Sequence, residues 1–175
     1  ANPDGVANDA LVGLSSDLSN SQTLAKDFAG ITSIQSAQLG DDGKGYATFD
    51  GAANTGGILT MNKISDSSTW TTVKGSATGL VAPKGIEVID GRSALIISDN
   101  GTKDIKVFDK NAIGDVSPLF TVANLGGVAA RNVWDTSYDN NSDTLYVAAT
   151  DGVVLVYDKF FATKGVDGPT KLIIP

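Results

Sequence analysis

A short stretch that the chain repeats constrains the fold more than any other feature of the sequence. "DIKVFDK" at residues 104–110 returns 49 residues later as "VVLVYDK" at 153–159, and a fainter copy, "GILTMNK", occupies 57–63. A nearly constant period of this size is typical of stacked supersecondary units. The repeat therefore predicts an array of similar structural units rather than one irregular domain.

Each copy follows a short β-branched and aromatic run that ends in turn residues. These runs are "YATFDG" at 46–51, "ALIISDNG" at 94–101 and "TLYVAATDG" at 144–152. Asp-Gly or Asn-Gly between two such runs predicts a hairpin. One further strand upstream and one downstream would complete four strands in about 45 to 50 residues, which is the pattern of a β-propeller blade. A β-sandwich is the alternative, but it has no reason to repeat a Val-aromatic-Asp-Lys sequence.

We therefore predict an all-β chain that forms a single β-propeller domain or segment over residues 1–175, with the first strand of each blade innermost and lining a channel. The predicted units are a partial blade at 1–30 and whole blades at 31–77, 78–125 and 126–175. Three and a half blades fall short of the roughly four to eight with which propellers close. Because an open arc exposes strand edges, we expect a larger or composite propeller.

Composition excludes several classes of function. The chain has 13 Lys and Arg against 20 Asp and Glu, so its net charge of −7 opposes binding to nucleic acid and to anionic membranes. It has neither Cys nor His, which removes thiolate nucleophiles, imidazole bases and the usual zinc sites. No apolar run approaches the roughly twenty residues that cross a bilayer, so we expect no membrane insertion.

The first residue gives an indication of location. An Ala at position 1 suits a mature end left by signal-peptide cleavage, although a shortened sequence would look the same. We expect a secreted, periplasmic or cell-surface protein.

The middle unit carries a family resemblance. Its opening "TGLVAPKGIEVID" and its end "FDKNAIGDVSPLFTVANL" resemble the NHL-like and YncE-like bacterial β-propellers, and the match covers Thr78 to Leu125 well and the rest loosely. The last unit departs from the pattern with the longer linker of "FFATKGVDGPTKLIIP". The resemblance implies the architecture, and such propellers include binding modules, envelope proteins and a few enzymes.

Five polar or aromatic residues fall on or near the predicted innermost strands and are our candidate ligand-binding residues: Glu87, Arg131, Asn132, Trp134 and Asp135. The polar surroundings of Trp134 suit a partly exposed recognition residue, with core packing as the favoured interpretation. The resemblance also extends to lactone-hydrolysing propellers, in which channel Glu, Asn and Asp residues hold one divalent metal. It implies a metal-dependent hydrolase as the alternative function, with Glu87 as a ligand.

A second candidate site lies in "DNNSD". Asp139, Asn141 and Asp143 occupy alternate positions, which is the oxygen spacing that opens a calcium loop, so calcium is a candidate cofactor. A plain hairpin turn is the other interpretation, because Thr144 follows where a calcium loop of the EF-hand type needs Gly. The repeated lysines Lys63, Lys110 and Lys159 are predicted to be solvated or edge-protecting charges.

These observations favour a non-catalytic secreted or cell-envelope propeller that acts as a protein-interaction or ligand-binding module. Its expected partner is a protein, or another copy that associates through open blade edges. Phe108 and Tyr157 occupy matching places in the repeat and are predicted to fill gaps between blades.

Overall fold

The structure is a computed structural model that describes residues 11–14, 21–25, 31–64, 66–127 and 131–174. Three antiparallel sheets, each of four consecutive strands, make up most of this part of the chain. The first sheet contains β3 (Ile31–Leu39), β4 (Gly45–Gly51), β5 (Gly56–Met61) and β6 (Thr71–Val73). The second contains β7 (Pro83–Ile89), β8 (Ala94–Asp99), β9 (Asp104–Asp109) and β10 (Phe120–Val122). The third contains β11 (Val133–Asp139), β12 (Thr144–Ala149), β13 (Val154–Tyr157) and β14 (Lys171–Ile173).

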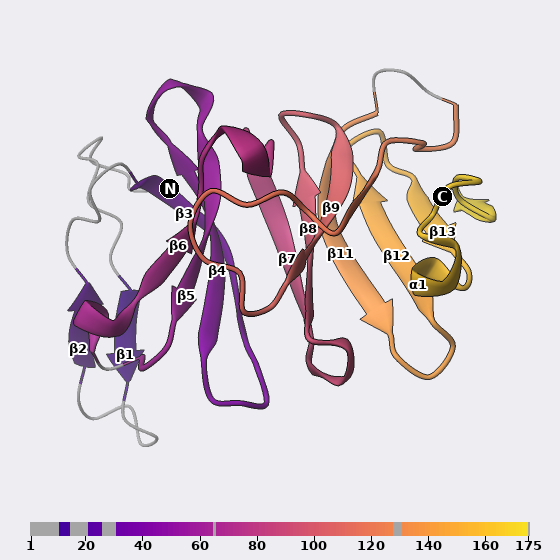
Figure 1. The fold of residues 1–175 in the computed structure, drawn as a ribbon. Helices are drawn as coiled ribbons and strands as arrows, with labels where there is room; N and C mark the ends of the chain where they lie inside the picture. The colour runs from indigo at the N-terminus through magenta and orange to yellow at the C-terminus, as the bar shows by residue number, and fades with distance from the viewer. Residues whose placement is uncertain (1–10, 15–20, 26–30, 65, 128–130, 175) are drawn as a thin grey trace.

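The sheets follow one another side by side in chain order (Figure 1). The leading strands β3, β7 and β11 are direct neighbours, as expected of innermost strands that line a channel. The three repeated stretches are the third strands β5, β9 and β13. The all-β prediction and the four-stranded unit are therefore confirmed.

Shorter elements complete the described chain. β1 (Leu11–Leu14) and β2 (Ser21–Ala25) form a two-stranded antiparallel sheet, while most of the predicted partial blade at 1–30 lies outside the described residues. One-turn 3-10 helices occupy Ala52–Asn54, Ser67–Thr69, Ser76–Thr78 and Asp90–Arg92, and α1 spans Phe160–Thr163. No helix in the described ranges has the length and apolar character needed to span a membrane.

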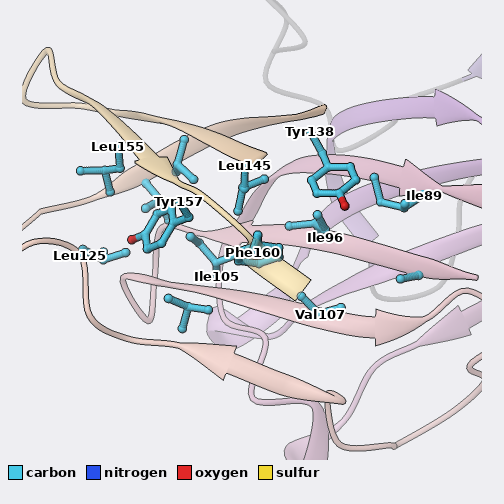
Figure 2. Close-up of a cluster of buried hydrophobic side chains, with 14 of the residues drawn as sticks. Ile89, Ile96, Ile105, Val107, Leu125, Tyr138, Leu145, Leu155, Tyr157 and Phe160 are labelled. Atoms are coloured by element: carbon cyan, nitrogen blue, oxygen red, sulfur yellow. The ribbon is translucent and has the colours of Figure 1, made fainter. Parts of the chain in front are cut away.

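Aliphatic and aromatic side chains fill the space between neighbouring sheets. Phe108 lies between the first and second sheets, and Tyr157 lies between the second and third (Figure 2). Both side chains are fully buried, which confirms that the two repeats present matching residues to matching interfaces. The long linker of the last unit contributes as well, because α1 places Phe160 in the core beside Tyr157 and Phe120.

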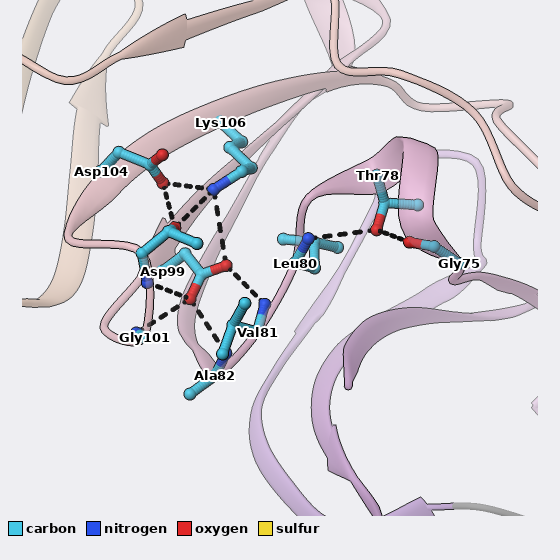
Figure 3. Close-up of polar contacts among 10 residues, drawn as sticks. Gly75, Thr78, Leu80, Val81, Ala82, Asp99, Gly101, Asp104 and Lys106 are labelled. Carbon is cyan, nitrogen blue, oxygen red and sulfur yellow. Dashed lines mark hydrogen bonds and ion pairs between the residues drawn. The ribbon is translucent and has the colours of Figure 1, made fainter. Parts of the chain in front are cut away.

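Asp99, at the end of β8, fixes the connection that enters the second sheet (Figure 3). Its carboxylate has no exposed surface and accepts hydrogen bonds from the backbone N–H groups of Val81 and Ala82, both at 2.9 Å. The Gly101 N–H donates to it at 3.0 Å, and the Lys106 ammonium lies 3.5 Å away. One buried carboxylate thus accepts hydrogen bonds from backbone amides in two loops. These amides have no partner in a neighbouring strand.

The prediction for Lys110 was wrong. Its side chain is buried and its ammonium pairs with Asp90 and, at 3.0 Å, with Asp42, 6.0 Å from the centre of the Tyr46 ring. The turns that follow β3 and β7 bring these carboxylates together, so a lysine that looks solvated in sequence becomes an ion-paired link between two sheets. The hydrogen bond to Asp90 raises the pKa of Lys110, and burial raises the pKa of Tyr46 to about 12.

Candidate functional site

Each innermost strand contains a β-bulge. Pairing with the second strand shifts at matching places, between Ile34 and Ser36 in β3, between Pro83 and Gly85 in β7, and between Val133 and Asp135 in β11; β3 has a further shift between Ile31 and Ser33. The extra residues of the three matching shifts are Gln35, Lys84 and Trp134, which are 49 and 50 positions apart. A bulge leaves its extra residue outside the ladder and redirects the side chain, so the repeat places three such residues along the inner strands.

These side chains form a connected row through Asp50, the next-to-last residue of β4. The Gln35 amide and the Lys84 ammonium each donate to Asp50 Oδ2 at 2.8 Å. The same ammonium lies 6.0 Å from the centre of the Trp134 ring. We call these four residues, Gln35, Asp50, Lys84 and Trp134, the bulge row. It combines an amide, a carboxylate, an ammonium and an indole from three consecutive sheets.

The preceding sheet holds each of the last two bulges by its backbone. Thr48 Oγ1 donates to the carbonyl oxygen of Lys84 at 3.0 Å, and Ser98 Oγ donates to that of Trp134 at 2.8 Å. Ser98 Oγ also accepts from Gly85 N–H at 2.8 Å. A side chain at Gly85 would collide with this arrangement, because its Cβ would lie 2.6 Å from Asp135 Oδ1 and 2.7 Å from Ser98 Oγ. The backbone at Lys84 and at Trp134 is therefore held in place by side chains of the preceding sheet.

Trp134 and Asp135 are the predicted site residues that the structure brings to this surface. Trp134 is 52% exposed, so the core-packing alternative is wrong for this residue. Asp135 follows it and lies against Gly85 of the neighbouring inner strand, with Oδ1 accepting the Thr136 N–H at 2.9 Å.

Glu87 is engaged elsewhere, between the sheets. Its Oε2 accepts from the Gln38 amide at 3.4 Å, and its carboxylate accepts the backbone N–H of Tyr138 on β11. Gln38 has the same role one sheet earlier, since its Oε1 accepts the Val88 N–H on β7. Both side chains thus satisfy amides on the inner edge of the next sheet. Burial raises the pKa of Glu87, and the nearby charge of Asp135 adds to this effect.

This raised pKa predicts that the melting temperatures of two variants, Glu87→Gln and Asp139→Asn, change with pH in opposite directions relative to wild type. Because folding raises the pKa of Glu87 above its reference of 4.5, its favourable contribution is present below that pH and is lost as the pH rises through the folded-state pKa. Glu87→Gln does not titrate, so its melting temperature relative to wild type should increase from about pH 3.5 to about pH 7. Thermal unfolding followed by circular dichroism at several pH values measures this difference.

Asp139→Asn is the matched control, because the hydrogen bond from Ser142 lowers the pKa of Asp139. Its melting temperature relative to wild type should decrease over the same range. A difference for Glu87→Gln that stays flat or falls with pH would contradict the assigned environment of Glu87.

Arg131 and Asn132 lie at the entrance to β11 and have contacts that fix loops. Arg131 is buried, with Nε donating to Asp151 Oδ2 and Nη1 donating to the carbonyl oxygen of Leu125, both at 2.8 Å. The carbonyl oxygen of Asn132 accepts the Thr150 N–H at 2.9 Å. Arg131 and the backbone of Asn132 therefore hold the turn after β12 and the loop before β11 in place, whereas Asn132 Oδ1 is buried without a hydrogen-bond partner.

The predicted calcium-loop residues form the turn between β11 and β12. Asp139 accepts the backbone N–H of Asn141 at 2.9 Å and the Ser142 hydroxyl at 2.6 Å. Asp143 accepts the Tyr138 hydroxyl at 2.7 Å and the Phe161 N–H at 3.0 Å. Within the described ranges, no three acidic side chains gather closely enough to hold a metal ion. Calcium binding at this turn stays a prediction.

Sequence reasoning missed Gln35, Asp50 and Lys84. A bulge shifts the register of pairing without changing composition, so these residues look like ordinary polar positions in or after a strand. Only the matching spacing of residues 35, 84 and 134 could have indicated Gln35 and Lys84, and it becomes meaningful once the strand pairing is known.

Comparisons with known proteins agree with this architecture. No protein-family model matches the chain, and a search of curated proteins finds no match by sequence. Among solved structures, a protein of unknown function from Bacteroides caccae aligns with a TM-score of 0.61 and 14% identity, over 92% of this chain and 52% of that one. The Dos1 propeller aligns with a TM-score of 0.61 and 10% identity, over 89% of this chain and 37% of that one.

The chain is thus an all-β protein with a β-propeller fold, and its four-stranded sheets are propeller blades. It spans about half the length of the first of these neighbours and less than half of the second. At such low identity the likeness shows the fold alone. The narrower NHL-like resemblance stays a prediction.

Proposed function

We propose that this chain is a non-catalytic protein-interaction module that recognises its partner with the bulge row. The observation that carries the proposal is the exposed indole of Trp134, presented by a bulge whose carbonyl is anchored to Ser98. Tryptophan is enriched among the residues that dominate binding energy in protein interfaces, because a large rigid ring buries much area at little entropic cost.

The rest of the bulge row supplies polar recognition around the indole. Lys84 and Gln35 converge on one oxygen of Asp50, which leaves the other oxygen, Oδ1, buried without a hydrogen-bond partner. A partner that places an apolar side chain on Trp134 would bury the exposed indole beside these polar groups. The net charge of −7 favours faster association with a basic partner surface.

The alternative function, metal-dependent hydrolysis in the channel, has no comparable support. Glu87, its implied metal ligand, already accepts hydrogen bonds from Gln38 and from the Tyr138 amide between two sheets. The interaction module is therefore the function that the geometry favours.

Trp134→Ala is the variant that tests this function. It should weaken partner binding at least about tenfold while changing the free energy of unfolding by no more than about 0.5 kcal/mol, because the indole contacts solvent rather than the core. Purified wild-type and variant chains serve as baits in extracts of the source organism, captured proteins are identified and quantified by mass spectrometry, and affinities are then measured with the purified partner.

Ile113→Ala is the matched control, since it also removes an exposed apolar side chain, 61% exposed, but from the loop between β9 and β10. Its captured proteins should equal those of wild type. Equal capture by the Trp134→Ala bait would remove the bulge row as the recognition surface.

An exported location is part of the same proposal and is supported by the absence of cysteine, which leaves folding independent of the redox state of the compartment. Fractionation of source cells with an antibody against the chain tests it, and a purely cytoplasmic signal would contradict it.

A further inference from the structure

The bulge row keeps hydrogen-bonding groups that its internal contacts do not use. An ammonium has three N–H donors, and the only hydrogen-bond acceptor of Lys84 among the described residues is Asp50 Oδ2, at 2.8 Å. The Gln35 amide donates from Nε2 to Ser33 Oγ at 2.7 Å and to Asp50 Oδ2 at 2.8 Å, while its Oε1 accepts no hydrogen bond from any described residue. Both side chains are partly exposed. The row therefore presents an unused donor at Lys84 beside an unused acceptor at Gln35.

The two groups lie close together, because Gln35 Nε2 and Lys84 Nζ are each 2.8 Å from the same oxygen of Asp50. In an extended chain the N–H and the C=O of one residue point to the same side, as they do in the hydrogen-bonded pairs of an antiparallel sheet. One residue of an extended partner segment can therefore accept a hydrogen bond from Lys84 and donate one to Gln35 at the same time.

The charges around the row favour an uncharged acceptor. Lys84 is the only cation of the row and is already paired with Asp50. Asp135 directly follows Trp134 in the sequence, and its charge adds to the effect of burial in raising the pKa of Glu87. Neither Asp135 nor Glu87 is ion-paired with any residue that the structure describes. A carboxylate of the partner would be repelled here, whereas a carbonyl oxygen would not.

We propose that the bulge row binds an extended main-chain segment of the partner protein. Lys84 donates to a backbone carbonyl oxygen of this segment, Gln35 accepts the backbone N–H of the same residue, and an apolar side chain of the segment covers the indole of Trp134. The inference rests on the proposed function and names the chemistry that the partner presents. Lys84 is then a specificity-determining residue, because it selects an uncharged acceptor without requiring a charged side chain on the partner.

Short peptides displayed on phage are the probe. The library is selected on the wild-type chain and depleted on Trp134→Ala, and the retained peptides are synthesised so that their dissociation constants can be measured by fluorescence polarisation. Each peptide is also made with one peptide bond at a time replaced by an ester, which weakens the carbonyl acceptor and removes the N–H donor. Lys84→Met keeps a long side chain without donors, and Lys84→Arg keeps the charge and the donors.

An ester at one position should weaken binding to the wild-type chain about tenfold, because a hydrogen bond to a charged group is weakened. The same ester should have little effect on binding to Lys84→Met, since the donor is then missing, and Lys84→Arg should restore the effect. Lys44→Met is the matched control. It removes an ammonium just before β4, at the opposite end of that strand from Asp50, and should bind the peptides as wild type does.

Three results would overturn the proposal. In the first, binding is lost when an aspartate or glutamate of the peptide is changed to its amide while no ester has an effect, which assigns Lys84 to a carboxylate and leaves the bulge row as the recognition surface. In the second, the ester effect is equal for wild type and Lys84→Met. Because the ester scan is first measured on the wild-type chain, the lack of any sensitive position decides against the proposal even if Lys84→Met does not fold. The third result, a selection without any peptide that depends on Trp134, would remove the proposed function together with this inference.

Discussion

Replacing Asp99 by alanine is expected to destabilise the protein by about 3 to 5 kcal/mol, because the change leaves several buried groups without a hydrogen-bond or ion-pair partner. The carboxylate is fully buried and is the acceptor for backbone amides of the loop before β7 and of the turn after β8. Without it, these amides lose their partner and the buried ammonium of Lys106 loses one of its two carboxylates. Urea unfolding followed by tryptophan fluorescence measures the loss.

Asp109→Ala is the matched control for Asp99, since it removes the same side chain from the end of the next strand, β9. Asp109 is exposed and its Oδ1 accepts the Asn111 N–H at 2.8 Å, so this change should cost about 1 kcal/mol. Asp99→Asn, which keeps one acceptor oxygen, should fall between the two and serves if the alanine variant does not fold. Equal losses for Asp99→Ala and Asp109→Ala would show that the carboxylate does not hold the entry loop.

Truncating the two repeated aromatics gives the second large effect. Phe108→Ala and Tyr157→Ala should each destabilise the chain by about 3 to 5 kcal/mol, because each leaves a cavity in the packing between two sheets. Both rings are fully buried, one against the first sheet and one against the second. Chemical denaturation of the two variants under the same conditions tests whether the interfaces are equivalent.

Tyr157→Phe separates the ring from its hydroxyl. It removes only the hydrogen bond to the carbonyl oxygen of Asn124, 3.0 Å long, and should cost about 1 kcal/mol. If both alanine variants were nearly neutral, the equivalence of the two repeats would be wrong.

The fold could be predicted further than the site because the two depend on different kinds of information. Blade strands are specified locally, by β-branched runs and Asp-Gly or Asn-Gly turns, and the structure places β4, β8 and β12 on the predicted runs. The turn "TDG" shows how: Gly152 has a φ of +81°, the left-handed conformation that such a hairpin turn requires.

The site depends on pairing across sheets, which sequence does not show. Glu87 was assigned to the channel because it lies on an inner strand, yet the register turns it toward the third sheet. Lys110 was assigned to solvent because a lysine after a strand usually lies there, yet two carboxylates from other turns surround it. The polar neighbours of Trp134 suggested partial exposure, which the structure has, whereas the core packing favoured for a large aromatic residue is wrong here.

The bulges also have an evolutionary consequence. A bulged residue contributes its backbone to the sheet but leaves its side chain outside the ladder, so the residue at that position can change without altering the pairing of its strand. Three repeats have filled it with glutamine, lysine and tryptophan, while Thr48 and Ser98 keep the same backbone contact beneath the last two. The fold therefore separates a part that must be preserved from a part that can vary, and a new binding specificity could arise by substitution at residues 35, 84 and 134 alone.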